Sequence, residues 1–396
     1  MRRTLTVVLL AAEFLAAGFV SAQEKQDLQH RKVQVLDVSG TPRERGLAHG
    51  RALRSQIREI IGDFERDLER KYKVEPKTFI SRFMADTNFM PAIKRWTPGL
   101  LDEVRGIAEG SGLSFESVYV FQLADEIWSM GRWAMRKKCT AIAVNRRGDQ
   151  PTMVAQNMDI PGFYQKFPTL LRVRRDDGPD TMVFTCPGLI GVNGMNSAAV
   201  AVCCNTLLQL RPSREGVPCL FVVRGVLERK NLAEAEAWLK RIPHAVGQNY
   251  TLGDPTGARA FECSAGAKVR FQPDPEGDFT YHTNHPLVNK DWHPDYAARC
   301  KQRGKTPEEG LSTCWRFETL KRRVKRGEPI TPDTIKASLA SRDDSRGRIA
   351  GSWTYGCTLF VLTDPPQLHL APGRPDRYAF QQFRFEPQTP DTPEKK

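Results

Sequence analysis

Cys139 lies where the pattern of the chain changes from helix to strand. The stretch 133–138 (Trp-Ala-Met-Arg-Lys-Lys) is basic and helical in character, whereas 139–144 (Cys-Thr-Ala-Ile-Ala-Val) is typical of a strand. If the bond between Lys138 and Cys139 were cut, one residue would carry both a thiol nucleophile and an amine base. A free α-amine has a pKa of about 7.7 to 8.0, so it could accept the thiol proton near physiological pH. The sequence therefore raises the hypothesis of a nucleophile created by cleavage.

Conventional hydrolase motifs are missing from the sequence. It contains no Gly-x-Ser-x-Gly, no His-Glu-x-x-His and no Walker loop. His282, His285 and His293 form a small cluster, but its spacing and the lack of a nearby carboxylate set favour hydrogen-bonded loop histidines over metal ligands. We therefore expect no metal and no cofactor.

The composition indicates a globular protein with a basic surface. A chain of 396 residues with 40% hydrophobic content can bury a sizeable core, as one large domain or two ordinary ones. The net charge is +13, yet the basic residues are spread out, as at 172–175 and 321–326, without a recognised nucleic-acid motif. A solvated basic face is the favoured explanation, and we expect no nucleic-acid partner. Binding to an anionic polymer is the alternative.

The first residues are typical of an export signal. Met1–Arg3 is basic, 4–20 is mostly apolar, and Val20-Ser21-Ala22 offers small residues for cleavage, so Gln23 is the expected mature start and 1–22 the signal peptide. An uncleaved membrane anchor is the alternative, although the apolar run is short for a span. We expect a secreted or periplasmic protein with a disordered, proline-containing tail at 386–396.

Export permits disulfides, but the cysteines do not define any. The count of nine is odd, so at least one thiol stays unpaired within the chain. The adjacent Cys203 and Cys204 lie on an apolar strand and are interpreted as packed thiols.

The periodicity indicates helices first and hairpins afterwards. Apolar residues at helical spacing predict a helix over 51–72, and further helices are expected at 98–110 and 115–130. From Cys139 the chain reads as a series of short strands and turns, followed by a mostly helical segment at 295–340 and a final hairpin at 355–371. This order favours an α+β fold.

Five short segments, in chain order, carry a resemblance to a known family: Gly40–Gly50, Cys139–Ala141, Gln156–Asp159, His282–His285 and 357–373. The chain resembles the acyl-coenzyme A:6-aminopenicillanic-acid acyltransferase family of self-processing N-terminal nucleophile hydrolases, similar to peptidase family C45. The resemblance implies a four-layer αββα sandwich. It also implies a pro-segment at 23–138 and a nucleophile-bearing catalytic chain at 139–385, with the two processed chains remaining associated.

The resemblance assigns roles to individual residues. Cys139 would be the nucleophile, Asp159 would hold or orient its amine, and Asn284 would be the side-chain donor of the oxyanion hole. Asn157 would support the site from the strand of Asp159, and the Thr140 hydroxyl would assist self-cleavage. Without the resemblance, Asp159 reads equally well as a turn-capping residue, Asn284 as a loop residue and Thr140 as an ordinary strand residue.

One role of the family has no clear match in the sequence. The family uses an arginine near the C-terminal part of the site, for which Arg342, Arg346 and Arg348 are the candidates. Phe163, Phe167 and Trp128 lie in segments near the expected site and fit a core as well as an acyl pocket.

The functional expectation is an exported, self-cleaving hydrolase that acts on a non-peptide amide through a thioester on Cys139. Transfer of the acyl group to a second acceptor is equally compatible with that thioester, but hydrolysis is favoured because coenzyme A is scarce outside the cytoplasm. The alternative is an envelope binding protein on the same scaffold whose precursor is never cut. The substrate is an acyl amide of unspecified identity.

Overall fold

The computed structural model describes residues 28–131, 139–274, 276–325, 329–342 and 345–386. The predictions for the signal peptide 1–22, for Lys138 and for 387–396 of the tail therefore lie outside the described residues. None of the described helices combines the length and apolar character needed to cross a bilayer.

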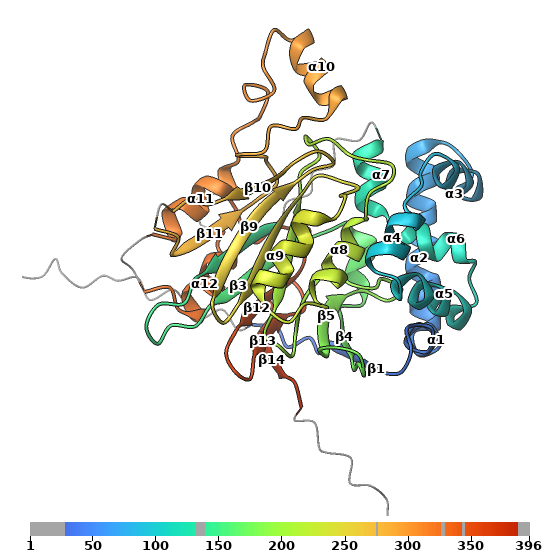
Figure 1. Ribbon diagram of the computed structural model, residues 1–396, viewed down its shortest axis with the longest axis horizontal. Coiled ribbons are helices and arrows are strands. Elements are labelled where there is room, and N and C mark those ends of the chain that lie inside the picture. The colour runs from blue at the N-terminus through green and yellow to red at the C-terminus, as the bar shows by residue number, and fades with distance from the viewer. Residues whose placement is uncertain (1–27, 132–138, 275, 326–328, 343–344, 387–396) are drawn as a thin grey trace, which may run out of the picture.

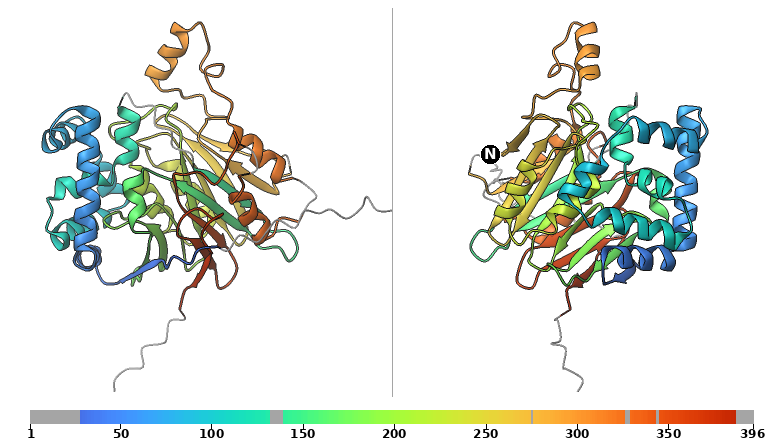
Figure 2. Two further views of the ribbon diagram at one scale, coloured as in Figure 1. Left: turned by 180° about the vertical axis from the view of Figure 1, so that it is seen from behind. Right: turned by 45° about the vertical axis from the view of Figure 1, so that its right-hand side comes forward.

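Two β-sheets lie face to face at the centre of the molecule (Figures 1 and 2). The eight-stranded sheet has the order β1 (Gln34–Val38), β4 (Thr169–Val173), β5 (Thr181–Thr185), β6 (Asn193–Asn196), β7 (Ala201–Thr206), β8 (Gln248–Asp254), β9 (Gly257–Cys263), β10 (Lys268–Phe271). The six-stranded sheet has the order β11 (Phe279–His282), β2 (Thr140–Val144), β3 (Met153–Asp159), β12 (Thr354–Val361), β13 (Gln367–Ala371), β14 (Gln381–Arg384). Apart from the parallel β1/β4 pair, the strand pairs are antiparallel, as the predicted run of hairpins requires.

Helices cover the outer faces of both sheets. The helices α8 (Cys219–Val226) and α9 (Leu232–Arg241) pack on β7 and β8, and α11 (Trp315–Arg323) and α12 (Pro332–Leu339) pack on the six-stranded sheet. Strands β2 and β3 contact β7 and β8 across the space between the sheets. The resulting order of layers is helix, sheet, sheet, helix, which confirms the α+β class and the predicted αββα sandwich.

The N-terminal part of the chain forms a helical unit beside the sandwich (Figure 1). It comprises α1 (Pro42–Ala52), α2 (Arg54–Tyr72), α3 (Pro76–Ala85), α4 (Met90–Trp96), α5 (Leu100–Ser111), α6 (Phe115–Phe121) and α7 (Ala124–Met130). The helix predicted at 115–130 is divided in two at Leu123, whose φ of −103° and ψ of 27° lie outside the helical values. The helical segment predicted at 295–340 is likewise divided, into α10 (Pro294–Gln302), α11 and α12.

The Gly40–Gly50 segment is mostly helix α1. Thr41 and Glu44 form a capping box and Pro42 occupies the first turn, which fixes the start of the helix. A Cβ atom on Gly46 would lie 1.9 Å from the main-chain oxygen of Glu103, so glycine is required where α1 crosses α5. The motif is therefore explained by close helix packing.

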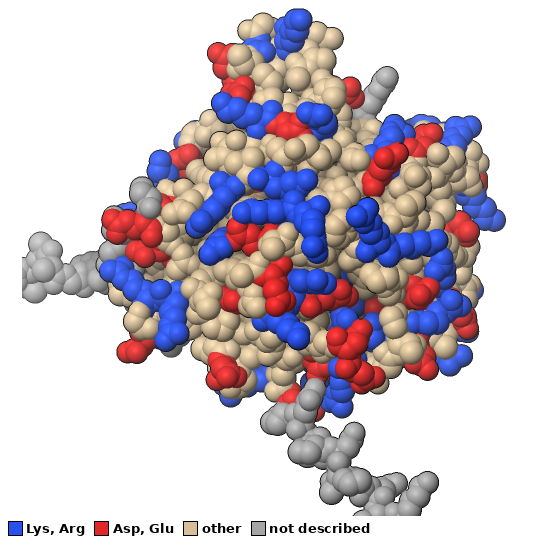
Figure 3. Space-filling view, in the orientation of Figure 1, with Lys and Arg blue, Asp and Glu red and all other residues tan. Residues whose placement is uncertain are grey.

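Charged side chains of both signs lie on the surface. On the face shown in Figure 3, acidic groups are interspersed among the basic ones. Lys240 and Arg259, for example, both pair with Glu236. Salt bridges of this kind neutralise individual basic side chains, although the net charge of the protein stays positive.

Candidate active site

The β2/β3 hairpin brings Cys139 and Asp159 together. Thr140 pairs with Asn157 in the register of these strands, so Cys139 directly precedes β2 beside the end of β3. The sulfur of Cys139 lies 3.7 Å from the Met158 sulfur and 3.7 Å from the main-chain oxygen of Asp159. Both Cys139 and Asp159 are buried, at 3% and 2% exposure. The structure thus places Asp159 where the sequence predicted it.

Arg316, at the start of α11, lies at the centre of the candidate site. Its guanidinium donates to the main-chain oxygen of Cys139 and to the Thr140 hydroxyl, both at 2.7 Å. It also donates to the side-chain oxygen of Asn284 at 3.0 Å. Its side chain is buried, and it touches three of the predicted site residues at once.

The sequence prediction did not identify Arg316. Of the candidates, Arg342 bonds to the main chain of Ala350, Arg346 lies over the ring of Trp315, and Arg348 is exposed. A signal was present, because Arg316 lies in the first turn of a helix, where the helix dipole disfavours a cation. An arginine at such a position needs specific acceptors, which here are Cys139, Thr140 and Asn284.

Asn284 joins this arginine to the wall of a pocket. Its amide nitrogen donates to the main-chain oxygen of Thr206 at 3.1 Å, and an amide nitrogen carries two N–H donors. The hydroxyl of Thr206 in turn donates to the carboxylate of Asp125 at 3.0 Å. Hydrogen bonds therefore link Cys139 to Arg316, Asn284 and the main chain of Thr206, whose side chain makes a separate bond to α7.

Asn157 lies on β3, the strand of Asp159, as the sequence predicted, and its side chain binds away from Cys139. Its side-chain nitrogen donates to the main-chain oxygens of Leu339 at 2.7 Å and Ile349 at 3.3 Å. Because Cys139 lies opposite Met158, the neighbouring position in β3, the Asn157 side chain projects from the other face of the sheet. Asn157 therefore anchors α12 on the face of the sheet opposite to the Cys139 side chain.

The histidines of the predicted cluster have separate roles. His282 pairs with Glu262 at 2.8 Å in the interior, and His293 caps α10. His285 lies 3.5 Å from the hydroxyl of Ser312. Within the described ranges, no group of three or more His, Cys, Asp or Glu side chains is arranged to hold a metal ion.

The cysteines differ in chemical environment. All nine lie in the described part of the chain, and no disulfide joins any of them. Burial raises the pKa of Cys186, Cys203 and Cys357 well above the ordinary value, which makes them inert packed thiols. Burial also acts to raise the pKa of Cys314, but the His285 hydrogen bond and the charge of Arg316 outweigh it and lower this pKa to about 6.

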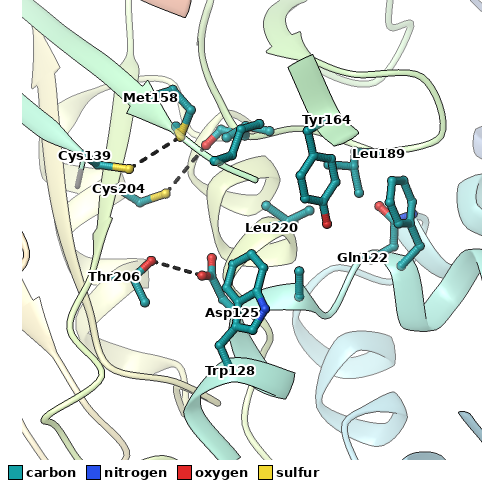
Figure 4. A pocket seen from close by; sticks show the side chains of 14 residues that line it. Gln122, Asp125, Trp128, Cys139, Met158, Tyr164, Leu189, Cys204, Thr206 and Leu220 are labelled. Carbon is teal, nitrogen blue, oxygen red and sulfur yellow. Dashed lines mark hydrogen bonds between the residues drawn. The ribbon is translucent and has the colours of Figure 1, made fainter. Parts of the chain in front are cut away.

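A mostly apolar pocket opens beside the Cys139 sulfur (Figure 4). Its empty volume, which includes open solvent, is about 490 Å³. The sequence could not decide whether Trp128, Phe163 and Phe167 belong to the core or to an acyl pocket. Trp128 lines this pocket, whereas Phe163 and Phe167 pack against the main core. The other apolar lining residues are Phe121, Ala124, Met158, Ile160, Tyr164, Leu189, Val192 and Leu220.

The pocket is built from both sides of the expected cleavage bond. Gln122, Asp125 and Trp128 come from the segment before Cys139, whereas Tyr164 and Leu220 come from the segment after it. The pocket is complete only when the two segments pack against each other.

Comparisons with known proteins point to the same family as the sequence motifs. The family model described as acyl-coenzyme A:6-aminopenicillanic acid acyl-transferase matches residues 146–312, a range that contains Asp159 and Asn284. The acyl-coenzyme A:6-aminopenicillanic-acid-acyltransferase 40 kDa form of Emericella nidulans is 27% identical over 253 residues, which are 63% of this chain and 68% of that protein. Protein dcd1A of Dictyostelium discoideum is 22% identical over half of each chain.

Among solved structures, penicillin V acylase from Agrobacterium tumefaciens superposes with a TM-score of 0.34 and 13% identity, over 59% of this chain and 82% of that one. The family match and the Emericella nidulans relative confirm the resemblance that the five sequence segments indicated.

Proposed function

We propose, on the premise of this resemblance to the acyl-coenzyme A:6-aminopenicillanic acid acyl-transferase family, that the protein is a self-cleaving cysteine amidase or acyltransferase. The family match supports the general chemistry, which is acyl transfer or amide hydrolysis. The observation that carries the specific mechanism is the position of Arg316, which bonds to Cys139 and Asn284 at the same time.

The proposed maturation consumes one water molecule. The Cys139 sulfur attacks the carbonyl carbon of Lys138, the C–N bond breaks, and the nitrogen takes a proton to become the free α-amine of Cys139. Water then opens the thioester, which restores the thiol and leaves Lys138 with a carboxylate. Thr140 lies beside Cys139, and Arg316 holds its hydroxyl in place.

Turnover of a substrate amide follows the same chemistry. The α-amine accepts the thiol proton as the sulfur attacks, and it passes the proton to the leaving amine. The amide of Asn284 stabilises the oxyanion, with its orientation fixed by Arg316 on one side and Thr206 on the other. Water releases the acyl group in a hydrolase, and a second amine or thiol does so in a transferase. Asp159 holds the α-amine from the end of β3.

The two processed chains remain together in this proposal. Buried contacts join the segment before Cys139 to the sandwich: Glu103 pairs with Arg224 at 2.7 Å, and Glu126 accepts from the main-chain nitrogen of Cys219 at 2.8 Å. The side chain of Gln122 adds bonds to Gly188 and Ile190. Loss of one peptide bond leaves all of these contacts intact.

Export is the last part of the proposal, and it is supported by the basic and apolar pattern of residues 1–22. N-terminal sequencing of the protein recovered from a secreted or periplasmic fraction would test it. A mature start at Gln23 is expected.

Mass spectrometry of the purified protein tests the central proposal. The wild-type chain should give two fragments that meet at Lys138 and Cys139, and Cys139→Ala should stay intact. Cys300→Ser is the matched control, because Cys300 lies on α10, which projects from the body of the molecule (Figure 1) and contributes no lining residue to the pocket, and this variant should be cut normally. An intact wild-type chain that also forms no thioester with an acyl amide would contradict the proposal and favour an uncut binding protein.

A further inference from the structure

The hydroxyl oxygen of Tyr164 differs from the other polar atoms of the pocket in its hydrogen bonding. The hydroxyl of Tyr164 is buried and has no hydrogen-bond partner among the described residues. Leaving such a group unpaired costs about 1 to 3 kcal/mol, so an unpaired buried hydroxyl in a ligand pocket calls for an explanation. Burial also raises the pKa of Tyr164 well above its ordinary value, which keeps the hydroxyl protonated and able to donate.

The neighbouring polar groups of the pocket are already engaged. Gln122 donates to the main-chain oxygens of Val118 and Gly188 and accepts from Ile190. Thr206 donates to Asp125. These groups serve to hold the pocket wall, whereas the Tyr164 hydroxyl is available to a ligand.

The Tyr164 ring is held rigidly. It belongs to the short 3-10 helix η1 (Gly162–Lys166) and stacks on Phe121, with ring centroids 5.4 Å apart, and it also contacts Phe163 at 4.4 Å. A hydroxyl on a fixed ring selects for the position of its partner, because little side-chain freedom is lost when the hydrogen bond forms.

Cys139 and Tyr164 lie on opposite sides of the pocket (Figure 4). Trp128, Leu189 and Leu220 contribute apolar surface to the same pocket. An acyl group whose carbonyl carbon meets the Cys139 sulfur would thus cross apolar surface before its far end approaches the Tyr164 hydroxyl.

We propose that the preferred acyl group is an apolar ring or chain that carries a hydrogen-bond-accepting oxygen at its far end, and that Tyr164 determines this specificity. The proposal rests on the proposed function for the position of the acyl carbonyl. The oxygen can belong to a hydroxyl, an ether or a ketone, since each accepts one hydrogen bond from a phenol.

The binding of matched primary amides tests the contact with Tyr164, which is called the Tyr164 subsite below. The probes are phenylacetamide against 4-hydroxyphenylacetamide, and hexanamide against 6-hydroxyhexanamide, titrated by calorimetry into the Cys139→Ala protein so that no chemistry occurs. In at least one pair the oxygenated amide should bind about tenfold more tightly, the usual worth of one buried hydrogen bond. Adding Tyr164→Phe should abolish that preference while the affinity for the plain amide is kept.

Kinetics on the wild-type enzyme separates this inference from the proposed function. The corresponding p-nitroanilides should show the same preference in kcat/KM, and Tyr164→Phe should remove it. Tyr296→Phe, whose hydroxyl bonds to Pro307 outside the pocket, is the control and should retain it.

The outcomes are distinguishable. Equal affinities within both pairs, no binding in either pair, or a preference that survives Tyr164→Phe overturns the subsite even if the anilides are cleaved. A binding preference that depends on Tyr164, without cleavage of any anilide, would contradict the proposed amidase activity and support the proposed specificity of Tyr164. Thermal melts of Tyr164→Phe confirm that the fold is kept.

Discussion

Arg316 donates a hydrogen bond to the side-chain oxygen of Asn284 at 3.0 Å while another nitrogen of the same guanidinium holds the main-chain oxygen of Cys139 at 2.7 Å. The arginine fixes which way the Asn284 amide faces, because an amide whose oxygen accepts from Arg316 must present its nitrogen elsewhere. One side chain thereby binds both the proposed oxyanion donor and the proposed nucleophile.

This relationship predicts that Asn284 and Arg316 act as a unit. Asn284→Ala should lower kcat by about 100- to 1,000-fold with a small change in KM, as is typical for loss of an oxyanion donor. Arg316→Met should lower kcat by a similar factor, and the double variant should be little worse than either single variant. Steady-state kinetics on an acyl anilide measures this.

Lys321→Met is a matched control, since it removes a charge from an exposed position of the same helix and should leave kcat unchanged. Fully multiplicative effects of the two site substitutions would show that Arg316 and Asn284 act independently.

Cys314 should react with alkylating agents in the folded protein. Its pKa is about 6, so the thiolate fraction rises through pH 6 and is nearly complete by about pH 7, whereas an ordinary thiol is mostly protonated there. Iodoacetamide labelling followed by peptide mass spectrometry should show a rate that increases up to about pH 7 and then levels off. The packed thiols Cys186 and Cys203 should stay unlabelled.

His285→Ala is the informative variant for this prediction. Removing its hydrogen bond should move the midpoint of Cys314 labelling to higher pH. A midpoint that does not move would show that His285 does not stabilise the thiolate.

The pair between Glu103 and Arg224 should hold the two segments together. Both side chains are almost fully buried; burial acts to raise the pKa of Glu103, but Arg224 outweighs it and keeps the pKa below the ordinary value. Glu103→Gln leaves Arg224 without its buried counter-charge, so it should destabilise the protein by about 3 to 5 kcal/mol. Denaturant unfolding measures the loss.

The exposed pair of Arg43 and Glu109 offers a control on the neighbouring helices. Glu109→Gln should cost less than about 1 kcal/mol, because solvent screens an exposed ion pair. Equal losses in the free energy of unfolding for the two variants would show that the buried pair of Glu103 and Arg224 does not hold the two segments together.

Stability should fall on mild acidification through buried histidines. Burial lowers the pKa of His49 and of His244 to about 4, below the ordinary value of 6.5. Between about pH 4 and 6.5 the unfolded chain binds more protons than the folded one, so the free energy of unfolding rises with pH across this window. Thermal melts across this range should show a rising Tm.

His49→Gln should reduce that pH dependence. His49 accepts from the main-chain nitrogen of Gly188 at 3.1 Å, and a glutamine oxygen can replace this acceptor without titrating. An unchanged slope of Tm against pH would show that His49 does not contribute to the linkage.

The sequence was sufficient to predict the local structure around the nucleophile. Strand periodicity on both sides of the Gly148 turn specifies a hairpin, and a hairpin necessarily returns Asp159 to the side of Cys139. The alternation of side chains between the two faces of β3 also follows from the local sequence. The resemblance implies a supporting role for Asn157, and only the structure shows that its side chain projects from the opposite face of the sheet and binds α12.

Other features depended on contacts between distant segments. Arg316 meets Cys139 across 177 positions of the chain, and the pocket joins α7 to strands and helices that come much later. Local propensity contains no information about such distances, so the arginine could not be chosen from sequence and Phe121 and Tyr164 could not be recognised as pocket residues. The sequence by itself predicted the α+β class and the strand that lies beside Cys139, because both follow from periodicity; the candidate nucleophile and the layered sandwich came from the resemblance carried by short motifs. Packing of the two sheets and their helices decided which arginine binds the main chain of Cys139 and which tyrosine lines the pocket beside its sulfur, because these contacts join segments far apart in the chain.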